Sequence, residues 1–428
     1  MKKILFLSAA GFVSLLSFGQ KIDRIIDAVK VKNIEKVLSS DMMGGRNPFS
    51  KTMELATGFI EDQFRATHLD YLEGLHSYRQ QFSVIKPAQL HASGSLNGQT
   101  LDSNSIVAFT TTALLNVNDQ SGYKKAHIAA GAKFNSEAFK YIQSDSNYLV
   151  LVDTSLAKDF ARLSRFKRQS FERNNNVLFV LTAADPLHYN IAVEHELFRF
   201  TLTNVVAVIP GKSRKDEYVI FSGHYDHLGI GKPNAALDSI YNGANDDASG
   251  ITAMILLSKY FKKMEHNERT LIFVAFTGEE SGGFGSRYFS RQLDPAKVIA
   301  LFNIEMIGTE SKWGANSAYI TGYEKSDMGK ILQANLANSK FHFEPDPYPQ
   351  QNLFYRSDNA TLAALGVPAH TISTSKMDSE KFYHTPGDEI ETLDLKNMAE
   401  VIKSIAISSK SIISGKDTPS RVAKEKNN

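Results

Sequence analysis

Hydrophobic and polar positions follow different patterns along the chain, and these patterns divide it into regions. From residue 24 to 85, apolar positions recur at helical spacing, interrupted by a loop at 43–50. Residues 86–198 instead contain short β-rich runs between polar segments, at 105–109, 148–152 and 176–182. We therefore predict that residues 86–198 form a smaller β-rich domain inserted into a larger one.

After residue 203, apolar strands alternate with amphipathic helices. Apolar runs of the kind expected for buried parallel strands occur at 205–209, 217–222, 271–276, 298–304 and 367–372. Helical spacing predicts helices over 249–264 and 395–406. This alternation predicts an α/β fold with a doubly wound, mainly parallel sheet flanked by helices.

The two flanking regions, 20–85 and 199–415, are then parts of one discontinuous domain. Residues 416–428 form a polar, lysine-rich tail, which we expect to fray. The first 19 residues have the pattern of a signal peptide, with two lysines, an apolar stretch, and small residues before a cut at Gln20. The apolar stretch is short for a span of ~20 residues, which favours cleavage over a membrane anchor. We therefore expect an exported protein, either periplasmic or extracellular.

Composition narrows the choice of partners. The chain has 48 basic and 46 acidic side chains and a net charge of +2, which does not favour nucleic acid or an acidic membrane surface. No segment after the signal peptide is apolar enough to span a membrane. The chain contains no cysteine, so its stability outside the cell must come from core packing and metal binding rather than from disulfides.

The first two of the polar clusters that follow these strands or lie in nearby loops each contain aspartate. On an extended chain, residues two apart point the same way, so Asp226 can reach the ring nitrogen of His224 that does not face a metal. Asp246 and Asp247 are adjacent, and a cation would relieve their repulsion. Asp247 also stands where a residue could cap the following helix. Both interpretations are compatible, because one aspartate can bind metal while the other caps.

Three further clusters supply glutamate and histidine. Glu279 and Glu280 follow an apolar strand and are flanked by glycines, which allow the backbone to turn sharply. One can ligate while the other takes a proton from a metal-bound water. Glu305 directly follows another apolar run, where an unpaired buried acid is costly. His384 lies between Tyr383 and a nearby carboxylate; such a histidine is often structural, just as a glutamate pair is often solvated.

Together these clusters supply two imidazoles and three carboxylates in the order His224, Asp246, Glu280, Glu305 and His384. Imidazole mixed with hard oxygen ligands suits zinc. Three carboxylates and a bridging hydroxide balance the charge of two Zn²⁺, which leaves Glu279 free to act as a base.

The sequence strongly resembles metallopeptidase family 28, the di-zinc aminopeptidases of bacteria. The resemblance covers roughly residues 200–410 and rests on six blocks in order: 222–229, 238–250, 277–286, 303–308, 356–358 and 383–388. It extends more weakly to 38–46. The inserted segment 86–198 has a fainter similarity to the protease-associated domain of many members.

The resemblance implies a role for each residue of the site. His224 and Glu305 hold one zinc, Glu280 and His384 the other, and Asp246 bridges them. Glu279 acts as the general base and Asp226 supports His224, while Tyr383 and Arg356 hold the substrate carbonyl or its product of attack. The peptide bond between Asp246 and Asp247 is expected to be cis. Glu305 departs from the commoner Asp, and Asn359 stands where many relatives have His.

The function implied is that of a secreted exopeptidase acting on peptide substrates. We favour cleavage from the amino end, because surplus carboxylates attract an α-ammonium group, and Arg356 is the one arginine that can be assigned to the site. The alternatives are a carboxypeptidase, a glutaminyl cyclase-like enzyme on the same fold, and a non-catalytic ectodomain.

Overall fold

The computed structural model describes residues 22–424, so the predicted signal peptide lies outside the described residues. The chain divides into two compact units: residues up to 81 together with those from 202 onward, and residues 82–201. The points of division lie inside β1 (Arg79–Leu96) and β8 (Tyr189–Ile209). Residues 79–85 are therefore strand, and the helical pattern predicted for them is wrong.

The first unit contains a mixed sheet with the strand order β15-β14-β16-β13-β9-β12-β8. Its four central strands, from β16 to β12, are parallel to one another. At the two sides, β14 is antiparallel to β16 and β8 is antiparallel to β12. The strands span Arg214–His224 (β9), Arg269–Phe276 (β12), Val298–Ile304 (β13), Ser317–Ile320 (β14), His342–Pro345 (β15) and Ala369–Ser373 (β16).

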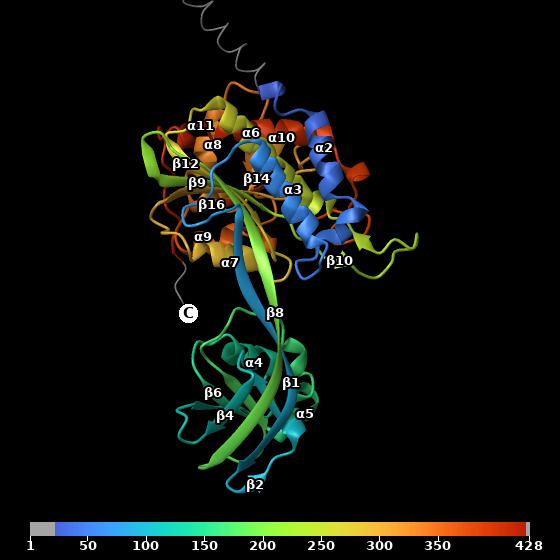
Figure 1. The fold of residues 1–428 in the computed structure, drawn as a ribbon, viewed down its shortest axis with the longest axis vertical. Coiled ribbons are helices and arrows are strands. Elements are labelled where there is room, and N and C mark those ends of the chain that lie inside the picture. Colours follow the sequence, from blue (N-terminus) through green and yellow to red (C-terminus); the bar gives the residue numbers. More distant parts are fainter. Residues whose placement is uncertain (1–21, 425–428) are drawn as a thin grey trace, which may run out of the picture. The chain divides into compact units, whose positions relative to one another are not determined.

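Helices cover both faces of this sheet (Figure 1). Because successive strand residues point to opposite faces, Phe221 packs into one core and Ile220 into the other. The first core contains side chains of α2 (Ala28–Leu38), α3 (Met53–Ala66), α6 (Ser249–Met264), α8 (Met328–Asn335), α10 (Leu395–Ser408) and α11 (Lys410–Ile413). The second contains side chains of α7 (Phe284–Ser290) and α9 (Asn359–Ala364). Burial on both sides explains the continuous apolar runs in the sequence.

The second unit is built on a four-stranded sheet with the order β3-β7-β6-β5, in which β6 is parallel to both neighbours. One core lies against α4 (Phe134–Ile142) and α5 (Ala157–Phe160), and the other contains side chains of β1, β4 and β8. Its remaining strands span Gln99–Thr100 (β2), Ile106–Phe109 (β3), Leu114–Asn118 (β4), Lys124–Ile128 (β5), Tyr148–Val152 (β6) and Val177–Leu181 (β7).

The segment that follows Gly415 contacts the first unit within its described residues 416–424. The Arg421 guanidinium donates to the carbonyl oxygen of Val298 at 2.6 Å. Val422 is buried in the second core, and its amide donates to the carbonyl oxygen of Gly366 at 3.2 Å. One apolar residue and one arginine therefore hold a segment whose composition is otherwise polar. Within residues 22–424, no helix is long and apolar enough to cross a membrane.

Candidate metal centre

The candidate site lies at the carboxyl ends of three neighbouring parallel strands. In the register of β9 and β12, His224 is opposite Phe276, the last residue before the Glu279-Glu280 turn. β13 pairs with the other side of β9 and ends at Ile304, immediately before Glu305. Parallel pairing therefore brings together three polar segments that are distant in the sequence, at the edge where α/β proteins bind ligands.

The fourth contributing segment is the turn at Ala244–Ala248, which precedes α6. The amides of Asn245 and Asp246 donate to the two carboxylate oxygens of Asp388, at 2.8 and 3.0 Å. The peptide bond between Asp246 and Asp247 is cis, which confirms the expectation from the resemblance. The Asp388 carboxylate thus orders the backbone that presents Asp246.

Asp247 has a structural role next to Asp246. Its carboxylate accepts hydrogen bonds from the amides of Gly250 at 3.1 Å, Met306 at 3.1 Å and His224 at 3.2 Å. The first of these satisfies an amide in the first turn of α6, although the N-cap residue of that helix is Ala248 and not Asp247. The other two join the ends of β9 and β13 to the same carboxylate, so that these strand ends share one anchor.

Arg46 ties the same region together from the N-terminal part of the chain. The side chain is fully buried and donates to the backbone carbonyls of Tyr225 and Gly243, at 2.9 and 2.8 Å. Its own carbonyl accepts a hydrogen bond from the amide of His227 at 3.0 Å. Arg46 therefore contacts the backbone just after His224 and just before the turn that carries Asp246.

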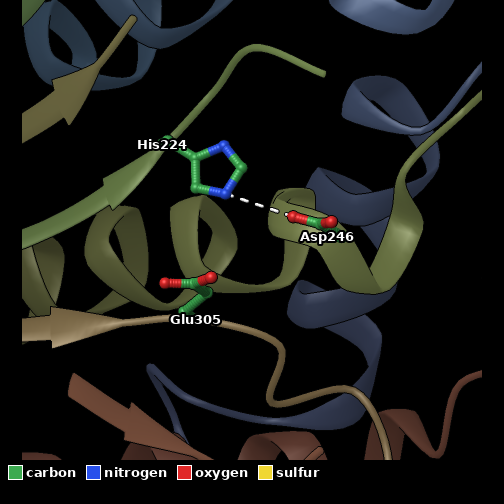
Figure 2. Close-up of side chains that lie close together, drawn as sticks. All are labelled: His224, Asp246 and Glu305. Atoms are coloured by element: carbon green, nitrogen blue, oxygen red, sulfur yellow. Dashed lines mark ion pairs between the residues drawn. The ribbon is translucent and has the colours of Figure 1, made fainter. Parts of the chain in front are cut away.

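Asp246 directs its two carboxylate oxygens to different histidines. Oδ1 lies 3.1 Å from Nε2 of His224, as Figure 2 shows, and Oδ2 lies 3.3 Å from Nε2 of His384. Nε2 of His384 is also 3.2 Å from Oε1 of Glu280. Glu305 forms a group with His224 and Asp246 in which the ligand atoms are within 4.8 Å of one another. The structure thus brings all five predicted ligands together, in two groups that share Asp246.

The second group contains a histidine to which the sequence analysis assigned no role. Nδ1 of His227 lies 2.9 Å from Oε1 of Glu280 and 3.9 Å from Oδ2 of Asp246. On a regular strand, residues 224 and 227 would point to opposite sides. β9 ends at His224, so this alternation no longer applies. The sequence offered one signal for this role: His227 is a further polar residue in the block that contains His224 and Asp226.

Asp226 contacts His224 differently from the prediction. Nδ1 of His224 forms a 3.1 Å hydrogen bond with the backbone carbonyl of Asp226, whereas the Asp226 carboxylate oxygen is 3.9 Å away. That carboxylate instead accepts a hydrogen bond from the amide of Glu279 at 3.2 Å. A backbone carbonyl can fix the tautomer of a ligand histidine as a carboxylate does. The side chain of Asp226 is thereby left to position the turn that carries Glu279.

The site holds far more negative than positive charge. Burial raises the pKa of Asp226 and of Glu305 to about 7. Burial and the neighbouring carboxylates raise the pKa of Glu279 well above its usual range. Burial alone would lower the pKa of His384. Its contacts with Asp246 and Glu280 outweigh burial, favour the charged imidazolium and raise the pKa to about 10. Both effects describe a cluster of carboxyl groups that attracts cations.

The donor set fits divalent metal. Among the described residues, Nε2 of His224, Nε2 of His384 and Oε1 of Glu280 are buried and have no hydrogen-bond partner. Buried polar atoms without partners are rare and costly. A cation would satisfy these atoms and compensate the surplus of carboxylates, and mixed imidazole and carboxylate donors suit zinc.

The remaining predicted residues line one pocket at this centre. Glu279, Glu305, Arg356 and Tyr383 all contribute to its wall, together with apolar and hydroxyl side chains. The ring of Tyr383 stacks on that of His384, with centroids 3.9 Å apart. Burial raises the pKa of the Tyr383 phenol, so it stays protonated and can donate a hydrogen bond into the pocket.

Comparison with known proteins finds similarity to the family that the sequence resembles. Residues 204–407 match the model of peptidase family M28. A probable zinc metalloprotease of Pyrenophora teres f. teres is 32% identical over 117 residues, which are 27% of this chain and 24% of that protein. A probable leucine aminopeptidase of Arthroderma otae is 24% identical over 59% of this chain and 70% of that protein. The chain thus matches only about a quarter of the length of the first relative.

Solved structures share the fold over most of the chain. An aminopeptidase from Aneurinibacillus sp. strain AM-1 aligns with a TM-score of 0.55 at 18% identity, covering 95% of this chain and 98% of that one. The fold is that of an α/β protein, and the buried histidine and carboxylate cluster is a candidate site for divalent metal. The match to peptidase family M28 covers residues 204–407.

Proposed function

We propose that this chain is an aminopeptidase that uses two zinc ions. The observation that carries this proposal is the geometry of Asp246, whose two oxygens lie 3.1 and 3.3 Å from the histidines of two separate groups. A carboxylate in that position suits a bridge between two metals. Bound zinc would polarise a carbonyl group and lower the pKa of a water molecule.

Glu279 is the group best suited to move protons in this reaction. It lines the pocket beside Glu280 and Glu305, and a carboxylate can accept a proton and later release it. In the proposed reaction, Glu279 takes a proton from the water that attacks the scissile carbonyl. It then delivers this proton to the leaving amine as the carbon–nitrogen bond breaks.

Two other residues hold the substrate in this proposal. The protonated Tyr383 phenol donates a hydrogen bond to the scissile carbonyl oxygen, where negative charge develops. Arg356 lines the same pocket, and its guanidinium is 3.5 Å from the side-chain oxygen of Gln351. The guanidinium thus remains available for a carbonyl or a carboxylate group of the peptide.

The charge of the pocket favours the amino end of a peptide. Four carboxylates line it, at Asp246, Glu279, Glu280 and Glu305, and Arg356 is the one cationic side chain among its described lining residues. A free α-ammonium group is attracted by the carboxylate that remains after metal binding, whereas a terminal carboxylate needs more than one cation. The similarity to the probable leucine aminopeptidase of Arthroderma otae supports the same choice.

A pair of peptides that differ only at the N-terminus tests the proposal. We expect the zinc-loaded protein to release the first residue of the free peptide and to leave the N-acetylated peptide intact. Chelation should abolish this release, and zinc should restore it. Equal cleavage of both peptides, or release of residues only from the carboxyl end, would refute aminopeptidase action and favour a carboxypeptidase.

Export is a second part of the proposal and rests on the sequence of residues 1–19. We expect the mature chain to begin at Gln20 and to occur in the periplasm or the medium. N-terminal sequencing of the protein from each cell fraction tests this. A cytoplasmic chain that still begins at Met1 would contradict it.

A further inference from the structure

The histidine that the sequence analysis did not assign, His227, lies against one half of the metal centre. Its side chain is 0% exposed, and in the described part of the chain neither ring nitrogen has a hydrogen-bond partner. A buried imidazole normally donates one hydrogen bond and accepts another. Leaving both unmade is costly, so the position requires an explanation.

The contacts of His227 are with two of the predicted metal ligands, Asp246 and Glu280. Its Nδ1 atom faces the same two oxygens as Nε2 of His384: Oε1 of Glu280, at 2.9 and 3.2 Å, and Oδ2 of Asp246, at 3.9 and 3.3 Å. The two imidazole rings lie edge to face, with centroids 5.7 Å apart. Nδ1 of His227 and Nε2 of His384 therefore approach the same pair of oxygens, and His227, Asp246 and Glu280 form a group whose ligand atoms lie within 4.8 Å of one another.

The Glu280 contact does not behave as an ordinary hydrogen bond. Although Nδ1 of His227 is within 2.9 Å of Oε1 of Glu280, neither atom forms a hydrogen bond of acceptable geometry with any described residue. A short approach without alignment suits two ligands that face a common ion. The backbone supports this orientation, because the amide of His227 donates to Arg46 and the ring packs close to Gly243.

We propose that His227 is a sixth metal ligand, which binds through Nδ1 at the position formed by Asp246, Glu280 and His384. This inference rests on the proposed zinc centre and makes its two halves unequal. The half with His227 has four protein donors, the number typical of closed zinc sites. The half with His224, Asp246 and Glu305 has three, the number typical of zinc sites that keep a position open for water or substrate.

The inequality predicts an order of binding. With four donors, the His227 half fills first and retains its zinc during mild chelation. The three-donor half fills second and exchanges its zinc more readily. The more weakly held ion would then be the one next to the open position.

The test measures zinc dissociation constants by competition with a chromophoric chelator, so it does not depend on activity. In wild-type protein we expect two constants. In His227→Asn we expect the tighter one to weaken by more than about 100-fold, because loss of a residue that only supports a ligand typically costs 10–100-fold. We expect the other constant to change by less than about threefold.

Two further variants make the assignment specific. Glu305→Ala removes a donor from the three-donor half, so the remaining zinc reports on the other half alone, and adding His227→Asn should weaken that zinc by the same factor. His370→Asn is the matched control. His370 is also buried in the first unit, but its ring nitrogens lie 2.7 Å from Oγ of Ser326 and 2.8 Å from the carbonyl oxygen of Thr321, so its loss should not change zinc affinity.

The outcomes separate this inference from the proposed function. Two zinc ions in wild-type protein and a change of 100-fold or less in His227→Asn would overturn the role of His227 and leave the di-zinc centre intact. Fewer than two ions in the wild type would refute the centre itself. If His227→Asn does not fold, a crystal structure of the zinc-loaded wild type decides. A ligand requires Nδ1 within roughly 2.0–2.1 Å of zinc, and a separation beyond 3 Å would overturn the proposal.

Discussion

Glu35 is a carboxyl group in the core of the first unit, and its replacement by glutamine tests the electrostatics that surround the site. It belongs to α2 and is fully buried. One oxygen accepts a 2.7 Å hydrogen bond from the hydroxyl of Thr252, and the other has no partner among the described residues. Burial raises the pKa of Glu35 to about 8, despite the opposing effects of Thr252 and Arg46.

The raised pKa makes stability depend on pH with a defined sign. Between the ordinary value of 4.5 and about 8, the folded chain keeps a proton that the unfolded chain releases. The free energy of unfolding therefore falls as pH rises, by up to about 1.4 kcal/mol per pH unit. Integrated from pH 5 to pH 7, these two pKa values give a loss of about 2.5 kcal/mol from Glu35 alone.

Glu35→Gln should remove this loss. The amide oxygen can still accept from Thr252, but the side chain no longer titrates. We therefore expect the free energy of unfolding of the variant, relative to wild type, to rise by about 2.5 kcal/mol between pH 5 and pH 7. Chelator-treated protein should be used, so that metal charge does not shift the titration.

The assay is urea unfolding followed by tryptophan fluorescence. The chain has one tryptophan, Trp313, which is 40% exposed and belongs to the first unit, so its emission reports on the unit that contains Glu35. Glu73→Gln, at an exposed position of the same unit, is the control for loss of one negative charge. If Glu35→Gln and the control change in parallel between the two pH values, the raised pKa of Glu35 is wrong.

Three other outcomes follow from the site. Glu279→Ala should keep both zinc ions, measured by elemental analysis, and lower kcat by ~10²–10⁴. His384→Ala should lose zinc. Near wild-type turnover in Glu279→Ala would show that Glu279 is not the base. Gly250→Ala would place a Cβ 2.1 Å from the carbonyl oxygen of Ile304 and 2.4 Å from Asp247, so we expect lower thermal stability and weaker zinc binding. By contrast, Gly58→Ala meets nothing within 4 Å in α3 and should stabilise by roughly 0.5–1 kcal/mol; equal effects of the two alanines would contradict the packing. Because the pKa of Glu305 is about 7 and zinc requires the carboxylate, lowering the pH from 7 to 6 should weaken zinc binding about fivefold through this group alone; chelator competition without that loss would refute the raised pKa.

The sequence alone determined the central strands and the nature of the site. The apolar run at 298–304 coincides with β13 and the helical pattern at 249–264 with α6, because elements buried on the sheet leave strong periodic signals. Polar residues that follow such strands can be assigned to one edge without knowledge of side-chain geometry. His224, Glu280 and Glu305 meet at that edge for this reason, whereas Asp246 and His384 reach it from the turn before α6 and from the loop after β16.

Only the tertiary structure decided the features that depend on where the chain leaves a regular element. β1 begins at Arg79 in a stretch whose spacing suggested a helix, and the four-residue strands β14 and β15 are too short to leave a periodic signal. On a continued strand, the side chain of His227 would point to the side opposite His224. β9 ends at His224, so His227 can face Glu280 instead. The hydrogen bond of His224 goes to the backbone of Asp226, and a backbone carbonyl carries no signature in the sequence. Side-chain periodicity is a property of regular backbone, so it predicts the scaffold and ends where the site begins.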